Sequence, residues 1–224
     1  MNKSLVVLST AAFITTSASA TVTGLSVQYM GVNSGRDIYS VFVNSSGPVG
    51  GQHDVMLNMI GHQVIAGSMS GVQHTDSFLN NYDEAVGHWN ASYTSASTAA
   101  TSNQFRDSYV TITGKTGAQS STSLDPSFGS GVNDPANPAI PAAAGWYTAN
   151  PAVDILIQGG KIKILQIAVV AGNTGYTGKV SVGYKLQGTT TPLYAMNLTY
   201  TIAPAPGALA LLGFAGLVSR RRRA

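Results

Sequence analysis

The chain has 224 residues, enough for one domain or two small ones, and only 9% of them are charged. Its net charge of +3 comes from the two ends, because without residues 1–20 and 204–224 seven basic residues face nine acidic ones, a net charge of −2. A body without clustered Lys and Arg lacks the electrostatic footprint of a nucleic-acid binder, and the absence of cysteine excludes disulfides, thiolate metal sites and a thiol nucleophile.

Residues 1–20 have the pattern of a secretory signal peptide. Lys3 supplies the positive start, residues 5–14 are mainly apolar, and Ala18-Ser19-Ala20 fits the small-x-small rule of the cleavage site. A ten-residue helix is about 15 Å long, too short for a hydrocarbon core of about 30 Å. We therefore expect signal peptidase to cleave after Ala20 and to leave Thr21 as the mature N-terminus. An N-terminal strand of small residues is the alternative.

The body between the two ends alternates apolar and polar residues at the period of two that half-buried strands show. Gly159-Gly160 is typical of a tight hairpin, and Lys161 and Lys163 are expected on the outward face of the strand that follows. The many short strands and frequent turns predict an all-β fold over residues 21–203, an antiparallel β-sandwich of jelly-roll-like form. Strands are expected at residues 25–30, 38–43, 55–65, 108–113, 153–158, 161–170, 180–186 and 193–202.

Residues 114–145 are expected to form one long loop instead of strands, because they are rich in Gly, Ser, Asn and Pro and poor in apolar residues. A loop of this length in a compact domain is usually functional. Asp125, Asn133 and Asp134 lie in it and offer the carboxylate and amide oxygens that Ca²⁺ binds. The spacing is not that of an EF-hand, and Asx-Pro pairs also make turns unaided, so a simple turn is the alternative to a calcium site.

Three aromatic residues, Trp89, Trp146 and Tyr147, lie in polar sequence surroundings. Aromatic faces flanked by amides and hydroxyls suit a sugar-stacking platform, so these residues are candidates for carbohydrate binding. The alternative is that they pack in the core, where large aromatic side chains bury most area.

The four histidines cluster within 36 residues and lie among carboxylates, a combination that would suit Zn, Cu or Ni. The sequence has no His-x-x-x-His or His-Glu-x-x-His pattern, so histidines exposed to solvent are the alternative. It also has no G-x-S-x-G elbow, and we assign no catalytic residue and no cofactor. The histidines are His53, His62, His74 and His88.

The C-terminal 21 residues have three parts. Pro204-Ala205-Pro206-Gly207 comes first, residues 208–218 are apolar, and the chain then carries Arg220, Arg221, Arg222 and Arg223. A helix over residues 207–218 would be about 18 Å long, which is marginal for a permanent anchor, and the arginines would stay cytoplasmic. These features predict a tail that enters the membrane only transiently. An uncleaved anchor is the alternative.

This tripartite tail resembles the PEP-CTERM sorting signal of Gram-negative, biofilm-forming bacteria. The resemblance implies recognition and removal by an exosortase-type membrane enzyme and association with exopolysaccharide. Ala205 stands where the family has glutamate, which implies a divergent sorting enzyme. Residues 107–114, 124–126 and 145–147 are also similar to uncharacterised exported domains of planctomycete-type bacteria, for which no activity is established.

These patterns together predict a non-enzymatic, exported protein of the cell surface or extracellular matrix. A secreted carbohydrate-binding module, assisted by calcium, is the second hypothesis, and a secreted hydrolase is the third.

Overall fold

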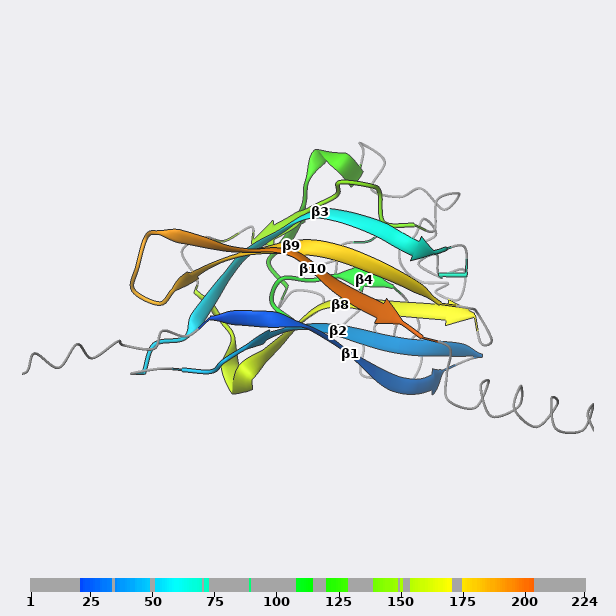
Figure 1. Ribbon diagram of the computed structural model, residues 1–224, viewed down its shortest axis with the longest axis horizontal. Coiled ribbons are helices and arrows are strands. Elements are labelled where there is room, and N and C mark those ends of the chain that lie inside the picture. Colours follow the sequence, from blue (N-terminus) through cyan, green and yellow to red (C-terminus); the bar gives the residue numbers. More distant parts are fainter. Residues whose placement is uncertain are drawn as a thin grey trace, which may run out of the picture.

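The computed structural model describes residues 21–33, 35–48, 51–69, 71–72, 89, 108–114, 120–128, 139–148, 150, 154–170 and 175–203. These residues form ten β-strands and two 3₁₀ turns, and the strands pair antiparallel in two sheets (Figure 1). The expected all-β, antiparallel fold is confirmed. The expected signal helix at 1–20 and sorting tail at 204–224 lie outside the described residues. Within the described part, no helix has the length and apolar composition needed to cross a membrane.

The four-stranded sheet has the order β1-β2-β8-β4. β1 (Val22–Asn33) and β2 (Arg36–Ser45) form a hairpin, and β2 then pairs with β8 (Lys161–Val170). β4 (Tyr109–Val110) covers only two of the six residues expected to be extended there, and it pairs with the middle of β8.

The six-stranded sheet has the order β10-β9-β3-β6-β5, and β7 also pairs with β3. β9 (Tyr176–Leu186) and β10 (Pro192–Ile202) form a hairpin, and β9 pairs with β3 (Asp54–Gly67). On its other side β3 pairs with β6 (Trp146–Thr148) and with β7 (Ile155–Leu156). β5 (Thr122–Leu124) and the 3₁₀ turn η4 (Pro126–Phe128) lie inside the range expected to be one long loop.

The expected hairpin at Gly159-Gly160 is wrong. Both glycines have positive φ (63° and 77°) and lie in the 3₁₀ turn η5 (Gln158–Gly160), as a tight reversal requires. The strands on either side do not pair with each other, however, because β7 pairs with β3 and β8 pairs with β2. The glycines therefore carry the chain from one sheet to the other.

Both sheets contribute side chains to a single hydrophobic cluster. Val41 and Ile167 come from the four-stranded sheet, and Met59 and Val182 come from the six-stranded sheet. Burial of apolar surface contributes about 25 cal/mol per Å², so this shared cluster is the main source of stability. The apolar residues of the period-two pattern are thus those that face the cluster, and the polar residues between them face the opposite side of each sheet.

β1 and β10 each lie at the edge of a sheet, and the two strands are in contact with each other. Both are irregular. The pairing of β1 with β2 shifts register between Val22 and Gly24 and between Tyr29 and Gly31, and that of β10 with β9 shifts between Ala195 and Leu198. In the latter bulge Asn197 has a φ of 54°, and its N–H donates to Ser181 Oγ at 3.0 Å.

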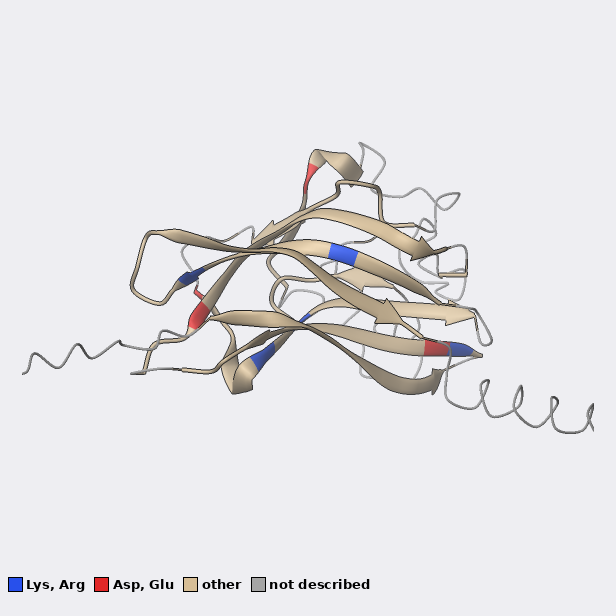
Figure 2. Ribbon diagram, in the orientation of Figure 1, with Lys and Arg blue, Asp and Glu red and all other residues tan. Residues whose placement is uncertain are grey.

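β1 begins and β10 ends at opposite ends of the long axis of the molecule (Figure 1). The chain therefore enters the described fold at one end and leaves it at the other. Figure 2 shows that charged residues are few and scattered over the strands between these two ends.

Candidate functional site

The two tryptophans that were candidates for sugar stacking are buried. Trp146 is 1% exposed, and its indole Nε1 donates to the carbonyl oxygen of Thr111 at 3.1 Å. Trp89 is 4% exposed, and its carbonyl oxygen accepts from Val110 N at 2.7 Å. Both rings belong to the hydrophobic cluster. The structure therefore does not bring these two side chains to a common surface with Tyr147.

Tyr147, the third candidate, is 44% exposed because it follows Trp146 on β6 and neighbouring residues of a strand point to opposite faces. The register of the sheet places it in a row of directly opposed residues that spans five strands. Tyr147 lies opposite Asn58, and Asn58 lies opposite Gly183. Gly183 lies opposite Tyr194, which is 52% exposed. We call Tyr194, Gly183, Asn58, Tyr147 and Ser123 the tyrosine row, in which Ser123 is the partner of Tyr147 on β5.

Gly183 makes room for the side chains on both sides of it. A Cβ atom at this position would overlap Asn58 Oδ1 and would lie 3.2 Å from Cε1 of Tyr194. The Asn58 amide and the Tyr194 ring thus lean over the same glycine from opposite sides. Asn58 Oδ1 is buried there and has no hydrogen-bond partner among the described residues.

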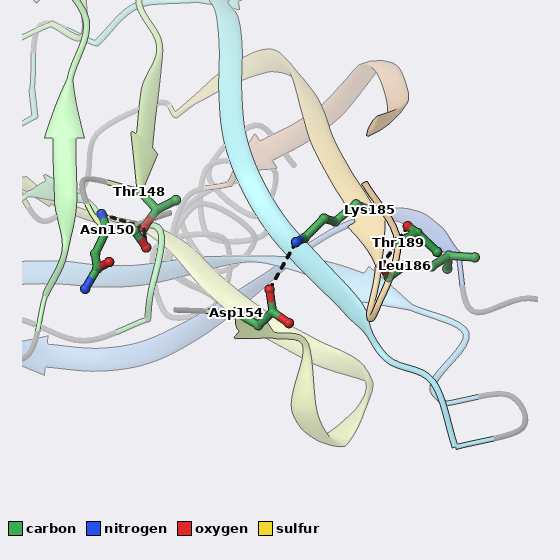
Figure 3. A network of polar contacts seen from close by, with 6 residues as sticks. All are labelled: Thr148, Asn150, Asp154, Lys185, Leu186 and Thr189. Carbon is green, nitrogen blue, oxygen red and sulfur yellow. Dashed lines mark hydrogen bonds and ion pairs between the residues drawn. The ribbon is translucent and has the colours of Figure 1, made fainter. Parts of the chain in front are cut away.

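An ion pair lies beside the tyrosine row. Lys185, on the same face of β9 as Gly183, contacts Asp154 Oδ1 through Nζ at 3.2 Å (Figure 3). Next to Tyr147, the Thr148 hydroxyl bonds with the backbone of Asn150 at 3.3 Å (Figure 3). The positive charge nearest the row in β9 is therefore paired, while the row itself carries no formal charge.

Of the three candidate calcium ligands, the structure describes Asp125. Its Oδ1 accepts from Ser127 N at 2.9 Å, and its backbone N–H donates to Gly145 O at 3.0 Å. The first of these bonds makes an Asx turn that begins η4. Asn133 and Asp134 lie outside the described residues, so the proposed set is not tested.

His62, in the second half of β3, forms a buried polar pair with Tyr200 of β10. The His62 side chain is fully buried, and its Nε2 lies 2.7 Å from Tyr200 Oη. Burial lowers the pKa of His62 to about 4, so the ring is neutral at pH 7, and burial also raises the pKa of Tyr200. The pair ties together two strands that are not neighbours, because β9 lies between them.

Of the three other histidines, the structure describes only His53. His53 precedes β3, next to Asp54, whose Oδ2 accepts from Ser45 Oγ at 2.7 Å. His74 and His88 lie outside the described residues. Within the part that is described, no three His, Asp or Glu side chains gather closely enough to hold a metal ion.

Lys163 differs from the expectation, since it is half-buried instead of facing solvent. Its Nζ donates to Tyr109 Oη and to Gln166 Oε1, both at 2.7 Å, and lies 4.8 Å from the centroid of the Tyr109 ring. Burial lowers the pKa of Lys163 to about 8. The register shift of β2 on β8 between Val41 and Phe42 falls beside Lys163, and strict alternation in the sequence gives no sign of this bulge.

The residues at the two expected processing sites are bonded to the body. The backbone N–H of Thr21 donates to Ser46 Oγ at 3.1 Å, and its carbonyl oxygen accepts from Ser46 N at 2.9 Å. The Thr21 hydroxyl lies 3.0 Å from Tyr184 Oη on the other sheet. At the opposite end, the carbonyl oxygen of Ala203 accepts from Tyr39 Oη of β2 at 2.6 Å. The described fold is thus closed at both ends by bonds between the sheets.

No protein-family model matches the chain, and no curated protein or solved structure shows significant similarity to it.

Proposed function

We propose that this chain is an exported, non-enzymatic protein of the bacterial cell surface or extracellular matrix. Signal peptidase removes residues 1–20, and an exosortase-type enzyme processes the tail at 204–224 after its transient insertion in the membrane. The body at 21–203 is a β-sandwich of jelly-roll-like form, and exopolysaccharide is its partner. The shared hydrophobic cluster supports the sandwich, since two sheets packed face to face bury one common core.

The observation that carries this proposal is the position of the two ends of the body. β1 begins one residue after the expected N-terminus, Thr21, and β10 ends one residue before Ala203, which precedes the Pro-Ala-Pro motif. Removal of both ends would therefore leave every described strand and its pairing in place. An extracellular protein that two enzymes trim needs this arrangement.

The polar groups of the described core also favour a structural role over an enzymatic one. His62 is bonded to Tyr200, and Lys163 is bonded to Tyr109 and Gln166, so each group stabilises contacts between strands. A neutral His62 without a nucleophile as its partner supports no acyl-transfer chemistry, which needs a Ser, Thr or Cys at the imidazole.

Intact-mass measurement of the protein recovered from cells and from the medium tests the proposal. The expected mature species runs from Thr21 to a residue near Ala203. The matched control replaces Arg220, Arg221, Arg222 and Arg223 with Ser, which should leave signal-peptide cleavage intact and reduce tail removal. A mature species that retains the four arginines in the wild type would instead show a permanent anchor.

A carbohydrate-binding module is the second candidate. The observation that favours it is the exposure of Tyr147 and Tyr194 in one row on the same face of the six-stranded sheet.

A further inference from the structure

We propose that the tyrosine row is a binding platform for a neutral polysaccharide chain. This inference rests on the proposed extracellular role and gives it a specific site. The site differs from the one that the sequence predicted, because it combines Tyr147 with Asn58 and Tyr194 in place of the two buried tryptophans.

The register shows that the row is continuous across the sheet. Tyr194, Gly183, Asn58 and Tyr147 are direct partners on four neighbouring strands, so their side chains project from one face. Neighbouring strands are about 4.8 Å apart, which separates the two tyrosines by about 14 Å. This span fits an extended ligand that crosses the strands and contacts both rings.

The side chains of the row suit a sugar. An exposed tyrosine ring offers an apolar face for the C–H surface of a pyranose and a hydroxyl for a hydrogen bond. Asn58 lies between the rings with its Oδ1 buried, so its amide N–H groups are what it would donate to a ligand, and Ser123 supplies a hydroxyl beyond Tyr147. A site with apolar contact area and a few directional polar groups is what binding of a polyhydroxylated ligand needs.

The charges around the row favour a neutral ligand over an acidic one. No member of the row is charged, and Lys185 next to it is already paired with Asp154. An anionic polymer would need unpaired Lys or Arg along its path, and the body as a whole has a net charge of −2. The row itself therefore favours a neutral polysaccharide over an acidic one.

Gly183 leaves space between the two tyrosines for the side chains of Asn58 and Tyr194. Because Gly183 has no side chain, the Asn58 amide and the Tyr194 ring both pack over the backbone of β9. An added Cβ would push them away from each other, since it would overlap Asn58 Oδ1. Gly183 is thus a positioning residue for the platform.

The test measures binding of the processed protein to cellulose, to dextran and to the neutral exopolysaccharide fraction of the producing cells, by pull-down and affinity electrophoresis at high salt. Alginate serves as the acidic comparison. We expect at least one neutral polymer to retain the wild type. Tyr147→Ala and Tyr194→Ala should each weaken binding about tenfold, since each removes the contact area of one ring. Tyr147→Phe and Tyr194→Phe should keep most of the affinity.

Met30→Ala is the matched control, because Met30 is 54% exposed and lies on β1 in the other sheet. It should bind like the wild type, and all variants should unfold at the wild-type urea midpoint within error. The inference is overturned if no neutral polymer retains the wild type, if alginate alone does, or if the double variant Tyr147→Ala/Tyr194→Ala binds undiminished. Self-association that the double variant abolishes would overturn it too, by making the row an interface between copies. Intact-mass measurement tests the proposed processing independently, so a failure of processing can be told apart from a failure of polysaccharide binding.

Discussion

The hydroxyl group of Tyr39, on β2, donates a 2.6 Å hydrogen bond to the carbonyl oxygen of Ala203, the last residue before the Pro-Ala-Pro motif. The bond crosses from the four-stranded sheet to the end of β10, the edge strand of the other sheet. Beside it, Tyr29 packs on Tyr39 with ring centroids 5.2 Å apart and donates to Asp37 Oδ1 at 3.0 Å. This contact fixes the end of β10 against the four-stranded sheet.

Tyr39→Phe should lower the free energy of unfolding by about 1 kcal/mol, because it leaves the Ala203 carbonyl without its donor while the ring still packs. Urea unfolding at pH 7.5 measures the change. Tyr147→Phe, at an exposed position, is the control and should shift the midpoint little. If the two variants are equally stable, the bond to Ala203 contributes nothing to the fold.

Acid should destabilise the protein through His62. Its pKa is about 6.5 when unfolded and about 4 when folded, so between these values the unfolded chain binds more protons and stability falls as the pH drops. The full loss is about 3 kcal/mol, reached below pH 4.

Urea unfolding at pH 7.5, 5.5 and 4 measures the acid effect, with His62→Gln as the matched variant. The variant should be less stable at pH 7.5 but should lose less stability toward pH 4. Asp54 opposes the trend, since burial, the largest cause, raises its pKa and makes its protonated form favourable in the folded state. A wild type that is as stable at pH 4 as at pH 7.5 would contradict the role of His62.

Lys163 should make the protein more stable as the pH rises from about 8 to about 9.5. Its pKa is about 10.5 in the unfolded chain and about 8 in the fold, so the unfolded state binds more protons in this window. The gain should be about 2 kcal/mol at most. Above pH 10 the trend reverses, because Tyr39 has its pKa raised to about 12, mainly by burial, and keeps its proton only in the fold.

Lys163→Met is the variant that checks this effect. It removes the buried charge and keeps an apolar side chain against the Tyr109 ring, so its stability should not rise between pH 8 and 9.5. Guanidinium unfolding across this range, with the exposed Lys161→Met as control, separates the two lysines. A rise of equal size in Lys163→Met would assign the effect to another group.

The tryptophan fluorescence of the folded protein should be that of buried indoles. Trp89 and Trp146 are almost fully buried, so the emission maximum should lie at short wavelength and acrylamide should quench it weakly. Addition of a polysaccharide should leave the spectrum nearly unchanged, in contrast to a site built on tryptophan.

Trp146→Phe should lower the free energy of unfolding by about 2–4 kcal/mol, since it leaves a cavity and removes the bond to the Thr111 carbonyl. Thermal unfolding of the variant checks this value, with Tyr147→Phe on the neighbouring, outward position as the comparison. A loss below about 0.5 kcal/mol would show that Trp146 is not a core residue.

Alternation in the sequence was sufficient to predict the long strands. β8 has the predicted bounds, 161–170, and β10 begins one residue before the predicted 193, because both segments are rich in the apolar, β-branched and aromatic residues that favour strands. β5 and β6 were not predicted, since three residues are too few to show a period. Bulges were also hidden, and one of them lies beside the half-buried Lys163.

The candidate site was predicted only at Tyr147. Adjacent residues of a strand face opposite ways, so the Trp146-Tyr147 pair could itself have indicated that only one of the two reaches the surface. Tyr194 is 47 residues further along the chain, and nothing in the sequence shows that β9 and β3 align Gly183 and Asn58 between the two tyrosines. Pairing register across a sheet is decided by packing of the whole domain, which one sequence does not display.

The register shifts in β1 and β10 hinder pairing between the edge strands of two copies of the protein. A straight, unbroken strand at the margin of a sheet would accept a strand from a neighbouring molecule and start a fibre. In this protein, both of the strands that meet along that margin carry a kink that interrupts the ladder of free N–H and C=O groups. A second copy that approached along these two edges would therefore find no continuous ladder to extend.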